Sequence, residues 1–298
     1  VSNFSMKNYG LFLQDTWYVN SNLTLTFGVR GDRPTTSPKP PAFATYALPQ
    51  TTDANGKWTG GFGLDNTNTY DGKFVIQPRF GFNYTFDSDR PTQLRGGVGL
   101  FQGDAPQVWV GNAYSTTGQN YLSYGSSTTT GLPGTLTCVW VPATSSCANG
   151  INFSPDGLNP SIPASGNAVR NLNDIADDFK LPSVWKANLA IDTELPWYGI
   201  VASAEVLVSE VKDGLFYRSL NVGPGFTGPD GRTLYWNPNL YVNTTARYNN
   251  NATFGDVYLI QNTSKGESQQ FTVSLQKPFK ADSDWSWNLG YTYTNAKE

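Results

Sequence analysis

The sequence is short of the side chains that most enzymes and metal sites use. It contains no histidine, two cysteines and one methionine in 298 residues. The absence of histidine removes the commonest acid–base group and the commonest metal ligand. Adjacent carboxylates such as Asp177 and Asp178 have acid–base chemistry, but nothing in the sequence indicates that they are buried or converge. We therefore expect no enzyme active site, no cofactor and no metal centre.

Charge is also scarce. Charged residues make up 14% of the chain, against about 25% in an ordinary globular domain. The net charge is −3, and no cluster of lysine and arginine stands out, so nucleic acid is not an expected partner. Mean hydropathy is nevertheless negative, at −0.39.

Long apolar runs are missing as well, since none approaches the roughly 20 residues that a membrane helix needs. If this chain spans a membrane, it has to do so as part of a closed barrel, because every backbone amide must be paired within the lipid. A chain poor in charge yet polar on average, with 14% aromatic residues, is typical of a barrel with a lipid face and a polar interior.

What the sequence does contain is strict alternation of apolar and polar residues. Between Asn22 and Asp32, Leu23, Leu25 and Phe27 share one parity and polar residues occupy the other. Successive strand side chains point to opposite faces, so each such segment predicts a strand with one apolar face. The other predicted strands are Tyr9 to Val19, Arg79 to Asp87, Leu94 to Phe101, Trp185 to Leu195, Ile200 to Val208, Gln270 to Lys277 and Trp285 to Thr294. Asp15 falls on the otherwise apolar parity of the first of these.

The connections between the predicted strands alternate between short and long. Short turns are expected at Asn20 to Ser21, Asp87 to Pro91, Pro196 to Gly199 and Lys280 to Asp284. Long connections lie at about 34–75, 104–182 and 212–265. Loops of this length are uncommon in compact soluble domains, whereas outer-membrane barrels have short periplasmic turns and long extracellular loops.

This sidedness has a consequence for the ends of the chain. The first strand must run inward and the eighth outward, so both ends are expected on the extracellular side. Complete single-chain barrels normally have both ends in the periplasm. We therefore expect an internal segment of a larger barrel, 1–298 forming part of one transmembrane barrel domain. An eight-stranded barrel closed on itself is the alternative.

Aromatic residues gather beside the short turns. Amphipathic rings concentrate at the bilayer interface, so these residues predict a girdle on the periplasmic side; an ordinary aromatic core is the alternative. They are Trp17, Tyr18, Tyr84, Phe86, Trp197, Tyr198, Phe279, Trp285 and Trp287.

Charged residues of the predicted strands fall on the polar parity. A lysine or arginine that faces lipid at mid-membrane costs about 2–4 kcal/mol, so these side chains should point into the barrel. They are Arg30, Arg79, Arg95, Lys186, Asp192, Glu194 and Glu205. We expect either that several contact a plug or line the transport path, or that they form a self-contained lattice of charges.

The longest connection carries candidates for two further roles. Large rings suit ligand capture at the barrel mouth, and the candidates there are Trp109, Tyr114, Tyr121, Tyr124 and Trp140. The alternative is that these rings pack the loops onto one another. Cys138 and Cys147 lie in the same connection, and a local disulfide is expected if the segment is in an oxidising compartment.

Several segments resemble one family. Asn8 to Asp32, "NYGLFLQDTWYVNSNLTLTFGVRGD", Ile76 to Phe86, "IQPRFGFNYTF", and Leu94 to Gly103, "LRGGVGLFQG", resemble barrel segments of TonB-dependent outer-membrane transporters. The likeness is closest to the Oar-like group, which carries a carboxypeptidase-regulatory-like domain ahead of the plug. Leu181 to Pro196 and Trp285 to Glu298 look like later strands of the same barrel.

The resemblance implies an all-β, transmembrane antiparallel barrel of 22 strands or more around an N-terminal plug, in the outer membrane of a Gram-negative bacterium. Import would be energised by TonB through a plug not seen in this chain, with a siderophore, a peptide or protein, or a glycan as cargo. The surrounding partners would be outer-membrane lipid and lipopolysaccharide. Two alternatives remain: a passive porin or adhesin barrel, and a secreted β-sandwich that binds carbohydrate.

Overall fold

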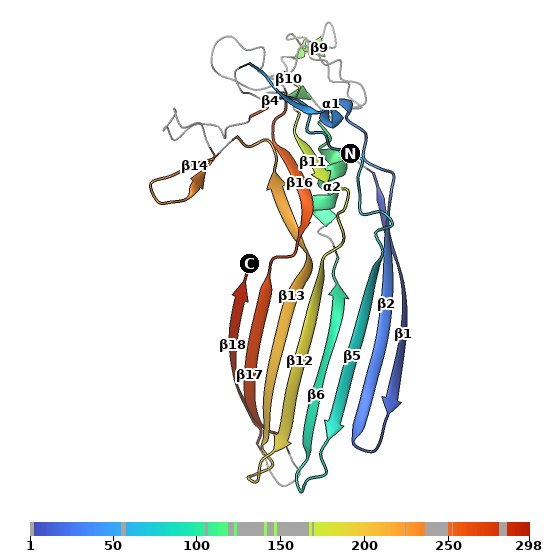
Figure 1. Cartoon of the computed structure of the whole chain (residues 1–298), viewed down its shortest axis with the longest axis vertical. Helices are drawn as coiled ribbons and strands as arrows, with labels where there is room; N and C mark the ends of the chain where they lie inside the picture. Colours follow the sequence, from blue (N-terminus) through green and yellow to red (C-terminus); the bar gives the residue numbers. More distant parts are fainter. Residues whose placement is uncertain are drawn as a thin grey trace.

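A computed structural model of the chain forms one large curved β-sheet with loops at one end (Figure 1). It describes residues 3–54, 58–104, 107–118, 122–123, 140–141, 146–147, 167–168, 170–223, 225–235, 250–251, 253–279 and 285–298. Of the four residue pairs between 122 and 168, only the backbone is described.

Eight long antiparallel strands make up most of a ten-stranded sheet, and each pairs with the next of the eight along the chain. They are β1 (Ser5–Tyr18), β2 (Leu23–Ser37), β5 (Val75–Thr85), β6 (Thr92–Gln102), β12 (Ser183–Glu194), β13 (Val201–Ser219), β17 (Glu267–Lys277) and β18 (Trp287–Lys297). All eight predicted strands are therefore confirmed; most bounds shift by a few residues, and β13 is much longer than predicted. The chain makes an open sheet: among the described residues, β1 and β18 end it and do not pair with each other.

Short turns lie at one end of the sheet and long connections at the other (Figure 1). We call these the turn end and the loop end. The first turn shows how sequence sets the register: the Asn20 side chain accepts hydrogen bonds from the backbone N–H groups of Asn22 and Leu23, at 2.9 and 2.8 Å. This is the local bonding that favours asparagine in turns.

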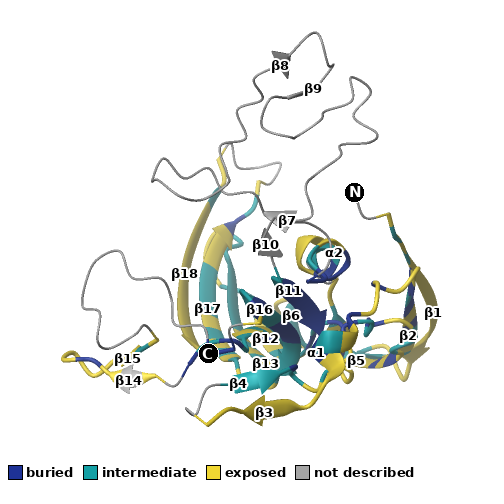
Figure 2. Cartoon of the chain, turned by 90° about the horizontal axis from the view of Figure 1, so that it is seen from above, coloured by how far each residue is buried: buried dark blue, intermediate teal, exposed yellow. Residues whose placement is uncertain are grey.

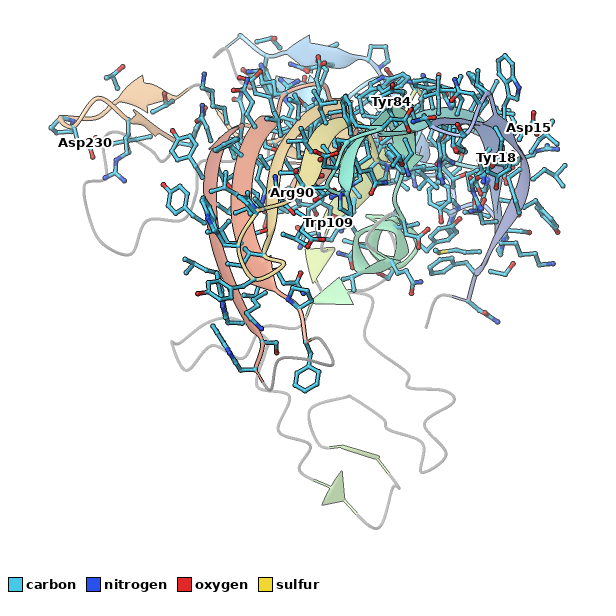
Figure 3. The ribbon with its side chains drawn as sticks, turned by 90° about the horizontal axis from the view of Figure 1, so that it is seen from below. Asp15, Tyr18, Tyr84, Arg90, Trp109 and Asp230 are labelled. Atoms are coloured by element: carbon cyan, nitrogen blue, oxygen red, sulfur yellow. The ribbon has the colours of Figure 1, made fainter. Side chains whose placement is uncertain are left out.

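The cross-strand register assigns each side chain to a face. Arg30 pairs with Phe12 and Gln77, while Val29 pairs with Leu13 and Pro78. We call the face with Arg30 the inner face and the face with Val29 the outer face. Asp15 pairs with Phe27 on the outer face, as the predicted parity required, and it lies on the outer side of β1 (Figure 3). The sheet curves around its inner face (Figure 2).

β13 extends further than its sequence predicted. It continues to Ser219, well into the segment expected to be loop, because Leu215 and Tyr217 pack against a buried cluster there. Up to Glu210 it pairs with β17, and from Gly214 onward it pairs with β16 (Val257–Thr263). β16 in turn pairs in parallel with β11 (Leu172–Ile175).

The long connections contain short elements. The first holds α1 (Ala44–Ala47), β3 (Gln50–Thr52) and β4 (Trp58–Gly60); the second holds α2 (Gln107–Ser115), β7 (Leu122–Ser123), β8 (Trp140–Val141), β9 (Ser146–Cys147), β10 (Asn167–Ala168) and β11; the third holds β14 (Phe226–Thr227), β15 (Thr233–Leu234) and β16. None of the described helices is long and apolar enough to cross a membrane.

The two clusters of packed, buried hydrophobic residues lie at the loop end and not on the eight long strands. One cluster joins α2 to β11 and β16 through residues that include Val110, Tyr114, Ile175, Phe179 and Ile260. α2 and β11 lie inside the curve of the sheet (Figure 2). A single sheet with its core at one end is not a β-sandwich, so the secreted sandwich alternative is wrong.

Candidate functional site

The inner face of the sheet gathers the charged side chains. Gly28 pairs with Arg79, Arg79 with Gly99, Arg95 with Ala190 and Ala190 with Glu205, so these strands share one register of inward positions. The same parity holds for the whole predicted set, which is Arg30, Arg79, Arg95, Lys186, Asp192, Glu194 and Glu205. The sheet therefore brings the seven residues to one face, where several of them belong to two linked groups.

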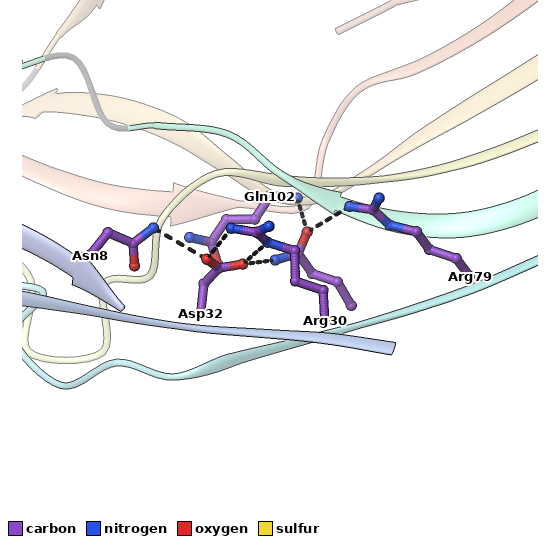
Figure 4. A network of polar contacts seen from close by, with 6 residues as sticks. Asn8, Arg30, Asp32, Arg79 and Gln102 are labelled. Atoms are coloured by element: carbon purple, nitrogen blue, oxygen red, sulfur yellow. Dashed lines mark hydrogen bonds and ion pairs between the residues drawn. The ribbon is translucent and has the colours of Figure 1, made fainter. Parts of the chain in front are cut away.

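The first group surrounds Asp32 near the loop end (Figure 4). The Asp32 carboxylate, which is 2% exposed, accepts hydrogen bonds from Arg30 Nε at 2.6 Å and Nη2 at 2.8 Å. Gln77 Nε2 donates to it at 2.5 Å and Asn8 Nδ2 at 3.3 Å. Four donors from three strands satisfy this buried charge, as burial of a carboxylate requires.

Sequence patterning did not single out the partners in this network. Gln77 Oε1 also accepts the backbone N–H of Gln102 at 3.0 Å, so one amide bridges β2 and β6. Gly10 leaves room for the Arg30 and Asp32 side chains, because a Cβ at this position would stand 2.7 Å from both Arg30 Nη2 and Asp32 Oδ1. The one feature of the sequence that could have indicated this network is Asp32, which is two residues from Arg30 and on the same predicted face.

The second group lies across β6, β12 and β13. Arg95 Nε donates to Asp192 at 3.0 Å, and its Nη2 lies 3.9 Å from Glu205. Asn188 Nδ2 donates to Glu205 at 3.0 Å. These side chains are partly exposed, so each ion pair contributes little to stability. They do neutralise one another within the wall, which is what the charge-lattice alternative describes.

Arg79 is placed differently. Its guanidinium carbon lies 4.7 Å from the centre of the Phe101 ring, and its Nη2 is 3.5 Å from Gln77 Oε1. Neither Arg79 nor Lys186 forms an ion pair with a described residue. Arg79 also lines a hollow of about 220 Å³ that includes Phe12 and Gln14. The arrangement is an exposed cation beside aromatic rings on the inner face.

At the loop end, α2 is held against the wall by ring contacts. Tyr114 is buried and stacks on Phe4 with ring centroids 4.2 Å apart. On the other side of the helix, Trp109 is 37% exposed and its ring lies 5.4 Å from that of Tyr217. Tyr217 stacks on Tyr258 at 4.9 Å. The three rings form a row, and Figure 3 labels Trp109 on α2, inside the curve of the sheet.

The five aromatic residues predicted as candidates for ligand capture therefore differ in what the structure shows of them. Tyr114 packs α2 onto β1, which supports loop packing for that residue, while Trp109 keeps part of its ring open. Tyr121 and Tyr124 lie outside the described residues, and only the backbone of Trp140 is described. Cys138 also lies outside them, so its disulfide with Cys147 stays a prediction.

A second cluster ties the three long connections together. It contains Phe43, Tyr46, Leu172, Phe254 and Val257. In its centre the Tyr46 hydroxyl donates to Asp174 Oδ2 at 2.9 Å, and Asp174 Oδ1 accepts the backbone N–H of Ile175 at 2.7 Å. Burial raises the pKa of the Asp174 carboxyl to about 7. Burial raises the pKa of the Tyr46 hydroxyl as well, and the nearby Asp174 adds to the rise.

Nearly the whole chain matches a single protein family. Residues 1–297 match the family described as outer membrane beta barrel domain. The chain belongs to this family. No curated protein matches it.

Among solved structures, this outer-membrane barrel domain is similar to the siderophore receptor PirA from Pseudomonas aeruginosa, at 15% identity and a TM-score of 0.43, over 97% of this chain and 34% of that one. It is similar to the copper transporter OprC, at 13% identity and a TM-score of 0.43, over 99% of this chain and 30% of that one. It is also similar to the RagAB peptide importer, at 12% identity and a TM-score of 0.42, over 98% of this chain and 22% of that one. The chain thus spans about a third or less of these proteins, and likenesses at this level carry no inference about cargo.

Its membership of the family explains the outer face of the barrel domain. Large apolar side chains lie open on that face, among them Leu11, Leu13, Phe80 and Leu289, with exposed fractions of 85%, 74%, 37% and 64%. A soluble protein rarely exposes such a surface, whereas a barrel in the outer membrane covers it with lipid. At the turn end, Trp17, Trp197 and Trp285 are more than half exposed, where the aromatic girdle is expected.

Proposed function

We propose that this chain is part of the barrel wall of a TonB-dependent transporter that imports a substrate across the outer membrane. Two observations support the proposal: the sequence resemblance of its strands to that group, and an inner face on which Arg79 stands beside Phe12 and Phe101 without a carboxylate partner among the described residues. The second carries it. A plug inside the barrel supplies the carboxylate partner that this cation lacks among the described residues.

In this proposal the loop end faces outside the cell and the turn end faces the periplasm. The connections at about 34–75, 104–182 and 212–265 are then extracellular, and their packed clusters form the mouth. α2 and the row of Trp109, Tyr217 and Tyr258 lie where cargo enters. The Oar-like group remains the finer part of the proposal, carried by the strand sequences alone.

The coupling machinery is not assigned to any residue of this chain. A plug and its TonB contact belong to the rest of the larger barrel that we propose, and 1–298 supplies a wall segment of about eight strands. We propose the cargo only as one of three classes, which are a siderophore, a peptide or protein, and a glycan. No catalytic step is part of this function.

Ion conductance separates this function from a passive porin. In planar bilayers with potassium chloride as the probe, the full-length protein should conduct little, because a plug closes the barrel. We expect Arg79→Glu to raise conductance, since the reversed charge weakens contact between plug and wall. Steady porin-like conductance of the unaltered protein would contradict the transporter proposal and favour the passive barrel. The ion pairs of Arg95 with Asp192 and Glu205 also support that alternative, because a porin wall needs such paired charges.

Two matched variants make this test specific. Arg79→Lys keeps the charge and should leave conductance low. Arg90→Glu makes the same reversal in the exposed turn between β5 and β6 and should also have no effect. If Arg79→Glu and Arg90→Glu behave alike, Arg79 has no special contact with a plug and belongs to the charge lattice.

A further inference from the structure

The outer face carries a broad apolar groove near the loop end. It crosses β1, β2 and β5 and is lined by residues that include Leu11, Leu13, Val29, Phe74 and Ile76. Its volume is about 990 Å³, at the upper end of the about 300–1,000 Å³ range of ligand pockets. Gly31 lies in its floor, where the Phe74 ring covers the position that a side chain would occupy. The side chains of Leu11, Leu13, Val29 and Ile76 all belong to the outer face, so the groove opens on the lipid-facing surface.

Two cations stand at the upper rim of this groove. Lys7 pairs with Thr35, and Arg33 pairs with Tyr9, so Lys7 and Arg33 are diagonal neighbours on the outer face. Such diagonal positions lie about 7–8 Å apart. Both side chains are exposed, and neither forms an ion pair with any residue that the structure describes. Arg33 is itself a lining residue of the groove.

The depth of the cations matches the outer boundary of the membrane. Lys7 is ten residues from the girdle residue Trp17 along β1, and Arg33 is ten residues from Leu23 at the start of β2. At about 3.3 Å per residue and a strand tilt of about 40°, ten residues rise about 25 Å. This is the height of the apolar band of an outer-membrane barrel. Lys7 and Arg33 thus stand at headgroup level, with the apolar groove directly below them.

We propose that this groove is a specific binding site for lipid A, the phosphorylated saccharolipid of the outer leaflet. Its phosphates contact the Lys7 ammonium and the Arg33 guanidinium, which presents a planar fork of donors to phosphate. Its acyl chains lie on Leu11, Leu13, Val29 and Ile76, and Tyr9, which pairs with Arg33 and is two residues from Lys7, adds an aromatic ring at the interface. A groove that spans three strands holds several chains side by side, which favours lipid A over a two-chain phospholipid. The inference depends on the membrane placement of the wall and not on the transport proposal.

Native mass spectrometry of the full-length protein in detergent tests the site, with diphosphoryl lipid A as the probe. Loss of one basic side chain near a membrane surface weakens lipid affinity about fivefold, and loss of two about thirtyfold. We expect Lys7→Gln with Arg33→Gln to weaken lipid A binding by about that factor. Val29→Trp, which fills the groove, should reduce binding with both cations present.

Controls separate a specific site from general lipid contact. Arg90→Gln removes one charge at the turn end and should leave lipid A affinity unchanged. Dephosphorylated lipid A should bind the unaltered protein and the double variant equally, and so show that the barrel is intact. Equal affinity of the unaltered protein and the double variant for diphosphoryl lipid A would overturn the proposal. Binding of phosphatidylglycerol as tight as that of lipid A would overturn the choice of lipid.

Discussion

The Asp174 carboxyl is a buried acid at the junction of the three long connections. It is 1% exposed, its neighbours are the Tyr46 hydroxyl and the Ile175 N–H, and the charge of Asp65 adds to the burial that raises its pKa to about 7. The ordinary value is 3.8, so the packed loops bind this proton more tightly than the unfolded loops do. The stability that it contributes is complete below about pH 4 and is lost as pH rises through about 7.

This sign gives a pH prediction for the loop cluster. Hydrogen exchange at 44–47 and 172–175 should be slower at pH 5 than at pH 8, once corrected for intrinsic rates. The difference in opening free energy is bounded by about 1.4 kcal/mol for each pH unit between the two pKa values. Asp174→Asn cannot ionise, so it should flatten this dependence. A pH dependence that persists in Asp174→Asn would assign the effect to another group.

The Asp32 network and the Asp230 pair offer a matched comparison. Both are aspartates two residues from their arginine, but Asp32 is buried, while the side chains of Arg232 and Asp230 are 80% and 47% exposed. Asp32→Asn should lower the free energy of unfolding by about 1–3 kcal/mol, because charge-assisted hydrogen bonds are lost in a buried place. Asp230→Asn should change it little. Urea unfolding of the protein in lipid measures both, and equal effects would contradict the role given to burial.

Among the elements, the strands were predictable and the loop elements were not. Alternation in β2, β5 and β17 is enforced by lipid on one side and a polar interior on the other, so it is written in the local sequence. α2 has no acidic residue in its first turn and no basic residue in its last. It is held by rings such as Phe4, far away in sequence, and β11 is held by its pairing with β16. Tertiary contacts of this kind leave no local pattern.

α2 therefore depends on its buried ring more than on its open one. Tyr114→Ala should loosen the helix, at a cost of about 3–5 kcal/mol for removal of a buried aromatic ring. Trp109→Ala removes a larger but partly exposed ring and should cost less. Hydrogen exchange over Gln107–Ser115 compares the two. Similar exchange in both variants would mean that the stack of Tyr114 on Phe4 does not anchor α2.

For the whole molecule, composition and loop asymmetry were enough to predict an outer-membrane barrel. Scarce charge, absent apolar runs and connections of unequal length each follow from the bilayer, which acts on the entire chain. The sequence also placed seven charges on the inner face. It did not show which of them pair, because the partners of Arg95 and Arg30 depend on register across strands. Nor did it reveal the groove under Lys7 and Arg33, since a hollow arises where Gly31 meets neighbours on other strands.

β13 runs through both the wall and the packed loops at the loop end. Its first part lies in the wall, where Glu205 joins the Arg95 network, and its last part carries Tyr217 beside Trp109 at the loop end. Between them the pairing with β12 is irregular, passing from Val211 to Asp213 against adjacent residues of the partner. Such a bulge bends a strand at one place. The bulge therefore lets the loop-end part of β13 run in a direction of its own, while Glu205 and Tyr217 stay on one continuous strand.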